Sequence, residues 1–120
     1  MNIIFGEEQA SKLAEKFTVL ELDTFKLGIN GPEITAFCVV EQIPISEFPI
    51  SDQLKIMHSN LLENYRQRQW NYCEQMIKKL RGSWGEELDT FYDEVQRRIS
   101  EFKMQAPASD WTPVILKSID

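Results

Sequence analysis

The feature that most constrains the fold is the stretch Asn60–Arg81, with the sequence NLLENYRQRQWNYCEQMIKKLR. Its apolar residues recur every three or four positions, and this spacing places them on one face of a helix. The pattern predicts the end of one helix, a turn around Tyr65–Trp70 and a second amphipathic helix. Because the segments on both sides also carry apolar faces that need a cover, we expect this stretch to lie at the centre of the structure.

Three helices are predicted in the second half of the chain. The first runs from about residue 52 to 66. The second begins near Trp70 and ends before Gly82, since glycine is common just past a helix. A loop at 83–85 then leads to a third helix, which Glu86 and Glu87 open and which continues to about Lys103. The apolar stripes of the three helices are Leu54, Met57, Leu61 and Tyr65; Trp70, Cys73, Ile77 and Leu80; and Leu88, Phe91, Tyr92, Val95, Ile99 and Phe102.

The first half of the chain has the alternation typical of strands. Thr18–Phe25 and Ile34–Glu41 predict an antiparallel hairpin around the turn region Lys26–Glu33, which holds an Asn-Gly-Pro sequence. Met1–Phe5 predicts a third strand. A helix of about three turns is expected between Met1–Phe5 and Thr18–Phe25. Its apolar face would consist of Ala10, Leu13, Ala14 and Phe17.

The expected fold class is therefore α+β, in a single domain of residues 1–120. It would consist of a helix-and-hairpin part (1–50), a helical part (51–104) and an extended tail (105–120). Gln42–Ser51, which carries Pro44 and Pro49, is the expected connector. Trp111 and Val114–Leu116 are too apolar to be left in solvent, so the tail is expected to pack either on its own helices or on another molecule.

The formal net charge is −6, and residues 1–50 hold 8 acidic and 3 basic side chains. This balance disfavours binding to nucleic acid or to an anionic membrane. The longest apolar run, around Ile34–Val40, is too short to span a bilayer, and the N-terminus has no signal-peptide pattern. We expect a cytoplasmic protein in which Cys38 and Cys73 are buried, reduced thiols.

Part of the sequence resembles a known family. Tyr65, Arg66, Arg68 and Trp70, then Tyr92 and Arg98, then Pro107, Asp110, Trp111 and Val114 form a pattern similar to the tetratricopeptide-like segment near the C-terminus of bacterial nucleotide cyclases. The likeness covers about residues 58–116. It implies a C-terminal three-helix tetratricopeptide-like unit, against which the helix and hairpin would pack. It departs from the standard repeat, because the spacing from Tyr65 to Cys73 is one residue short.

The rest of the chain is too short for a cyclase catalytic domain, so cyclase activity is not implied. A second resemblance covers the whole chain and includes VLELDTF and TAFCVVE, in residues 19–25 and 35–41. These segments look like small proteins of marine cyanobacterial viruses, which have no known activity. That likeness implies a viral protein made in the cytoplasm of a bacterial host.

Tetratricopeptide-like helix pairs bind other proteins. Asn60, Asn64 and Arg68 are spaced at i, i+4 and i+8 and would share one helix face. Two amides and a guanidinium can hold an extended peptide backbone, so these three residues are the predicted partner-binding site. The alternative is that they are solvated polar residues opposite the apolar stripe.

Other functional readings have less support in the sequence. A basic cluster with Trp70 and Tyr72 interleaved is the single hint of nucleic-acid binding; its members are Arg66, Arg68, Lys78, Lys79 and Arg81. His58 lies beside an apolar stripe and is expected to be packed in the core. We find no phosphate loop, nucleophile elbow or metal motif, so no cofactor, metal or catalytic residue is expected.

Three functions remain in competition. The first is a non-catalytic module that binds one host or viral protein through its helical half. The second is an assembly component that forms a homo-oligomer through the hairpin edge and the Trp111 tail. The third is an enzyme or small-ligand binder.

Overall fold

The computed structural model describes residues 1–40 and 48–117. The chain divides into two compact units, one formed by residues 1–42 and 113–120 and the other by residues 43–112. The first is a mixed sheet with one helix, and the second is helical, so the predicted α+β class is confirmed. The expected tail is shared between the units: residues 105–112 belong to the helical unit, and the residues from 113 onward belong to the sheet unit.

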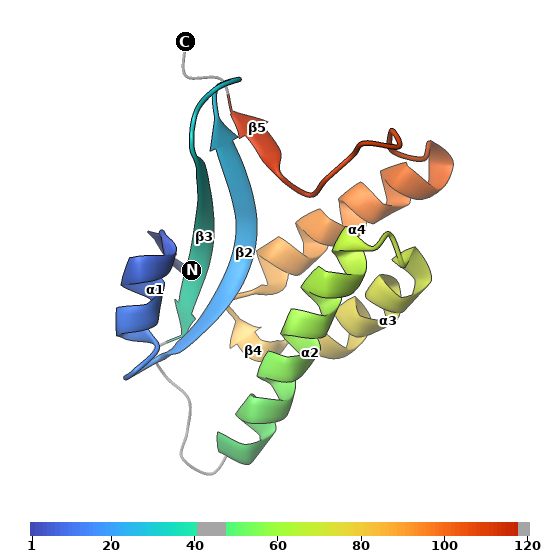
Figure 1. Ribbon diagram of the computed structural model, residues 1–120. Coiled ribbons are helices and arrows are strands. Elements are labelled where there is room, and N and C mark those ends of the chain that lie inside the picture. Colours follow the sequence, from blue (N-terminus) through green and yellow to red (C-terminus); the bar gives the residue numbers. More distant parts are fainter. Residues whose placement is uncertain (41–47, 118–120) are drawn as a thin grey trace. The chain divides into compact units, whose positions relative to one another are not determined.

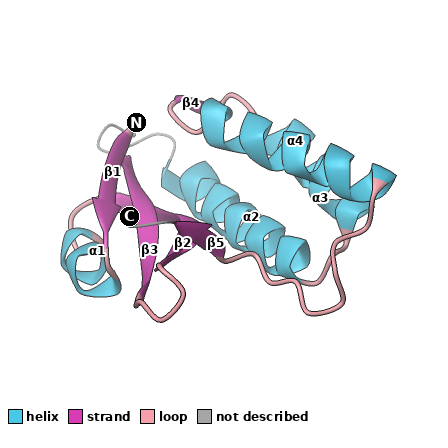
Figure 2. Ribbon diagram, turned by 90° about the horizontal axis from the view of Figure 1, so that it is seen from above, coloured by secondary structure: helices cyan, strands magenta, loops and turns pink. Residues whose placement is uncertain are grey.

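The sheet unit contains four strands in the order β1-β3-β2-β5 (Figures 1 and 2). β1 (Asn2–Phe5) and β2 (Thr18–Leu27) each pair antiparallel with β3 (Glu33–Val40). β5 (Ile115–Lys117) pairs in parallel with the end of β2. The predicted three-stranded arrangement is confirmed, whereas β5 was expected only as part of an extended tail.

Two details of the sheet unit differ from the predictions. α1 (Glu7–Leu13) is about two turns long rather than three. The helix ends at Leu13 because the chain must turn before β2 begins at Thr18. In this turn the Leu13 carbonyl accepts hydrogen bonds from the N–H groups of Lys16 and Phe17 at 3.1 and 2.9 Å. The hairpin loop is also shorter than predicted, because β2 continues to Leu27. Within the loop, an added Cβ at Gly31 would lie 1.4 Å from the Leu27 carbonyl oxygen, so only glycine fits.

The helical unit contains α2 (Phe48–Arg66), α3 (Trp70–Leu80) and α4 (Asp89–Met104) (Figure 1). α3 has the predicted limits, and Gly82 beyond it adopts a left-handed φ of 79°. α2 begins four residues before the predicted start, inside the expected connector. Pro49 is tolerated there because the first turn of a helix needs no N–H donor at that point. The remainder of the expected connector, up to residue 47, lies outside the described residues.

The start of α4 also differs from the prediction. Ser83–Glu86 forms a short extended segment, β4, instead of a loop that leads directly into the helix. Asp89 rather than Glu86 occupies the first turn of α4, and its Oδ1 accepts a hydrogen bond from the Gly82 N–H at 2.8 Å. This bond satisfies the Gly82 N–H, a backbone donor just past α3, and it links the end of α3 to the first turn of α4.

The core of the helical unit consists largely of the residues of the predicted stripes. Its buried side chains are His58, Leu61, Tyr65, Cys73, Ile77, Leu80, Trp84, Leu88, Phe91, Tyr92, Val95 and Ile99. Periodicity alone therefore identified the inward faces of all three helices.

Candidate interaction surfaces

The structure places the three predicted partner-binding residues at the end of α2 and in the turn that follows it. Asn60 is exposed, and its backbone carbonyl accepts a hydrogen bond from the Asn64 side-chain amide at 2.8 Å. Asn64 therefore bonds within its own helix. Arg68 lies past the end of α2, in the turn before α3, so the three residues do not continue as one helix face.

Arg68 holds a segment of its own chain. Its Nη2 donates to the carbonyl oxygens of Ala108 at 2.8 Å, Ser109 at 3.2 Å and Trp111 at 3.4 Å. Its guanidinium carbon lies 5.4 Å from the centroid of the Trp111 ring, a cation–π distance. The guanidinium thus binds peptide carbonyls, but they belong to the same molecule and to a turn, which the Trp111 N–H closes by donating to the Ala108 carbonyl at 2.9 Å, rather than to an extended peptide.

Four aromatic side chains surround this contact and form what we call the aromatic cluster: Tyr65, Trp70, Phe102 and Trp111. The ring centroid of Trp111 lies 5.5 Å from Tyr65, 5.8 Å from Trp70 and 5.1 Å from Phe102. Trp70 and Phe102 stack at 5.2 Å. Each such pair contributes about 0.5–1.5 kcal/mol beyond its buried area. The Trp111 segment therefore packs on the helices of its own chain, which is the first of the two arrangements that the sequence allowed.

The basic cluster proves to be largely engaged in contacts within the chain. Arg66 pairs with Glu63 at 3.4 Å, and Arg81 pairs with Asp93. Arg68 is bound to backbone carbonyls. The two remaining members of the basic cluster, Lys78 and Lys79, are exposed. This arrangement supplies little of the positive field that phosphate binding requires.

His58 is packed in the core, as predicted, with 1% of its surface exposed. Its Nδ1 lies 2.9 Å from the Tyr92 hydroxyl, and its ring lies 6.0 Å from the Phe91 ring. His58 is thus enclosed by the core and does not face solvent.

Cys38 and Cys73 are both buried, and neither forms a disulfide with the other, as predicted. Burial raises the pKa of the Cys73 thiol to about 11, and its Sγ donates to the Leu61 carbonyl at 3.8 Å. A thiol with so high a pKa is a poor nucleophile. Within residues 1–40 and 48–117, no group of three or more histidine, cysteine or acidic side chains is arranged to hold a metal ion.

Charged side chains join α4 to α3 and cover its exposed face. Glu74 accepts from Lys103 Nζ at 2.6 Å and from Gln96 Nε2 at 2.8 Å, and these two hydrogen bonds lower its pKa. Glu94 accepts from Arg97 at 2.6 and 3.0 Å, and this bonding lowers the Glu94 pKa to about 2. Both shifts come from hydrogen bonds and ion pairs on a helix surface.

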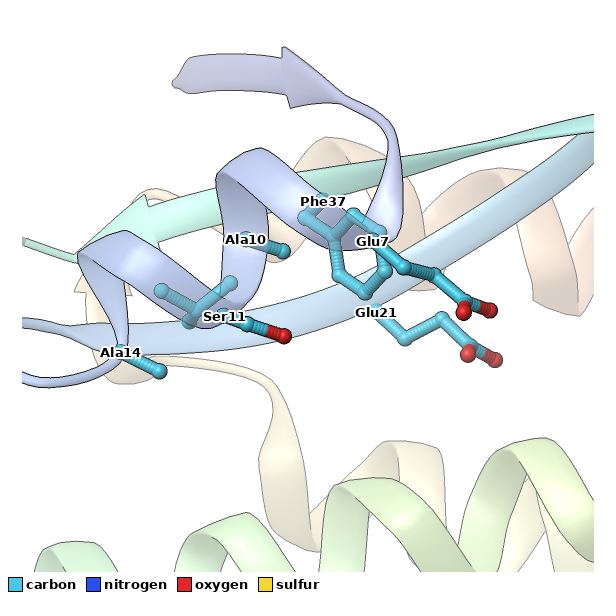
Figure 3. Close-up of a pocket in the computed structure, with 7 residues that line it drawn as sticks. Glu7, Ala10, Ser11, Ala14, Glu21 and Phe37 are labelled. Atoms are coloured by element: carbon cyan, nitrogen blue, oxygen red, sulfur yellow. The ribbon is translucent and has the colours of Figure 1, made fainter.

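A shallow pocket of about 320 Å³ lies between α1 and the sheet (Figure 3). Its lining residues are Glu7, Ala10, Ser11, Ala14, Val19, Glu21 and Phe37. Figure 3 shows the carboxylates of Glu7 and Glu21 extending in the same direction beside the Phe37 ring. The sequence analysis missed this pocket because it depends on how α1 crosses the sheet. Its two carboxylates give it an acidic character.

An exposed apolar row of the sheet unit begins just before β1, the edge strand, and continues along it. Met1, Ile3 and Phe5 are 47%, 48% and 55% exposed. Alternate residues of a strand point to the same face, so these three side chains form one row. β1 pairs with β3 on one side, and its other side is an edge of the sheet. Sequence reasoning predicted the strand, but only the strand order shows that it is an edge.

Comparison of the chain with protein-family models, with curated proteins and with solved structures finds no match. The resemblances to the tetratricopeptide-like segment and to cyanobacterial virus proteins therefore stay predictions. None of the helices in the described part of the chain is long and apolar enough to cross a membrane.

Proposed function

We propose that this protein is a non-catalytic protein–protein interaction module. The observation that carries the proposal is the β1 edge, where an apolar row lies beside backbone groups that no strand of the sheet covers. Exposed apolar rows and open sheet edges are the usual sites at which another chain adds to a protein. The chemistry of the described residues supports the non-catalytic part, because His58 and Cys73 are buried and the Glu94 shift comes from surface ion pairs.

This proposal moves the binding surface away from the predicted residues. Arg68 is bound to residues 108–111 and Asn64 to its own helix, so a partner at that site would first have to displace the tail. Asn60 alone keeps an exposed side chain without a described role in the fold. The resemblance to cyanobacterial virus proteins supports the further proposal that the partner is a host or viral protein in a bacterial cytoplasm.

The second candidate function is assembly into a homo-oligomer, and the same β1 edge favours it. The sequence analysis expected the Trp111 tail to contribute to such an oligomer. Trp111 instead packs in the aromatic cluster of its own chain, so the tail contact is not part of this candidate. An oligomer would therefore have to form through sheet edges, at β1 or at β5, where Leu116 is 60% exposed.

Light scattering of the purified chain over a hundredfold range of concentration, followed by reconstitution with a purified partner, tests both functions. A monomer that forms a saturable complex of fixed stoichiometry with a protein captured from the source cell supports the interaction module. A concentration-dependent oligomer that binds no captured protein supports assembly and overturns the first proposal.

A further inference from the structure

The backbone of β1 divides its hydrogen-bonding groups between the sheet and the open edge. The Gly6 N–H donates to the Thr35 carbonyl of β3 at 2.9 Å. In an antiparallel ladder, alternate residues bond to the same neighbour, so Ile4 and Asn2 also direct their N–H and C=O groups toward β3. Ile3 and Phe5 therefore direct theirs toward the open edge, which can receive a further strand.

The two faces of this edge differ in chemistry. Ile3 pairs with Cys38, and Phe5 pairs with Ala36, so the Ile3 and Phe5 side chains lie on the face of those buried residues. The opposite face carries Ile4, which pairs with Phe37, and α1 covers that face at Phe37 (Figure 3).

The α1 side of the edge is acidic. Glu7 and Glu8 open α1 directly after β1, and both are exposed. Lys12 lies 3.7 Å from Glu8 and compensates only part of this charge. An added strand would thus meet an apolar row with every second side chain, and its other side chains would lie on the face that carries the acidic residues of α1.

We propose that the β1 edge binds an extended peptide strand in which apolar residues alternate with lysine or arginine. The apolar residues would lie beside Ile3 and Phe5, and the basic residues would lie on the α1 face, in the negative field of the carboxylates that open α1. This inference rests on the proposed function and names the chemical class of its partner. Main-chain hydrogen bonds to the edge supply affinity, and the two alternating faces supply selectivity.

A second copy of this chain fits the edge less well than such a peptide. β1 has four residues, and a pair of such strands would bury far less than the roughly 1,200 Å² of a stable dimer. Each copy also carries a net charge of −6, which a basic peptide neutralises and a second copy doubles.

Fluorescence anisotropy with two labelled synthetic peptides tests the inference on the full chain. One probe is Lys-Val-Lys-Val-Lys-Val, and the control is Glu-Val-Glu-Val-Glu-Val. The lysine probe is expected to bind saturably below about 1 mM, at least roughly tenfold more tightly than the glutamate control. Binding should weaken as salt is added, because exposed charges are screened.

Two variants at one position locate the binding surface. Ile3→Pro removes an N–H that faces the open edge without removing a bond to β3, and proline is tolerated at such edge positions. It should weaken binding of the lysine probe about tenfold. Ile3→Val keeps the N–H and an apolar, strand-forming side chain, and should retain most of the binding. Glu7→Gln with Glu8→Gln should remove the preference for the lysine probe.

Circular dichroism of each variant checks that the fold is intact. Saturable binding that Ile3→Pro leaves unchanged, or no binding of either probe, would overturn the inference. The proposed function is judged separately, by whether the parent chain forms a complex with a purified cellular protein. If that complex forms and Ile3→Pro does not affect it, the interaction module stands and the β1 edge is not its site.

Discussion

The guanidinium of Arg68 donates a 2.8 Å hydrogen bond to the carbonyl of Ala108, 40 residues further along the chain. The backbone of Arg68 itself has a φ of 63°, in the left-handed region that most side chains avoid. This strained conformation places the guanidinium over the Trp111 ring and next to the carbonyl oxygens of Ala108, Ser109 and Trp111. One residue of the α2–α3 turn thereby connects the tail segment to the helices.

Arg68→Ala should destabilise the protein by about 1–2 kcal/mol, because hydrogen bonds to a charged donor are lost at a partly exposed position. Hydrogen exchange at residues 108–112 should rise more than exchange at α3. Arg68→Gly should be less harmful by about 0.5–1 kcal/mol, since glycine relieves the left-handed strain. Urea unfolding measures each change. Arg66→Ala, which removes an exposed ion pair, is the control and should cost less than about 0.5 kcal/mol; an equal cost for both arginines would contradict the role of Arg68.

Tyr92→Phe should lower the free energy of unfolding by about 1–3 kcal/mol, because it removes a buried hydroxyl that lies 2.9 Å from His58 Nδ1. Replacing both residues, as in His58→Leu with Tyr92→Phe, should cost less than the sum of the two single changes. The measurement is a double-mutant cycle by urea unfolding. Strict additivity would show that the two side chains do not interact energetically.

The stability of the helical unit should depend on pH through Glu94. Its pKa falls from 4.5 to about 2 on folding, chiefly because of hydrogen bonding with Arg97. The contribution is therefore fully present above pH 4.5 and is lost as the pH falls toward 2. Since the Glu94 side chain is 40% exposed, solvent screening limits the contribution to about 0.5–1 kcal/mol.

Glu94→Gln should accordingly destabilise the protein at pH 7 but change little at pH 2.5. Urea midpoints at the two pH values measure the difference, with Glu15→Gln, at an exposed position of the other unit, as the control. The same loss for Glu94→Gln at both pH values would mean that its ionisation is not linked to folding.

Neither thiol should react with Ellman's reagent at pH 8 until the protein opens. Cys38 and Cys73 are buried, and the Cys73 pKa of about 11 leaves little thiolate at that pH. In denaturant both should react fully. Lys79→Cys adds a thiol at an exposed helix position and should react at once, which confirms that the reagent is active. Rapid labelling of Cys73 in the native protein would show that the helical unit opens easily.

Some features of this protein follow from the sequence by itself. The limits of α3 and the inward residues of α2, α3 and α4 are set by local spacing, because a continuous apolar stripe can be buried in only one helical arrangement. The alternation in Thr18–Phe25 and the turn residues before β3 identify the hairpin for the same reason. The buried His58 and the two buried thiols also follow from their positions beside these stripes.

Other features were decided only by the tertiary structure, because they depend on residues that are far apart in the sequence. β5 is three residues long and exists through its pairing with β2, some 90 positions earlier. Asn60, Asn64 and Arg68 share a helical spacing, yet α2 ends before Arg68 and the tail occupies its guanidinium. The β1 strand could be predicted, but its place at the edge depends on which strand pairs with β3. Local periodicity determines which face of an element is apolar, whereas long-range pairing determines which groups are left for a partner.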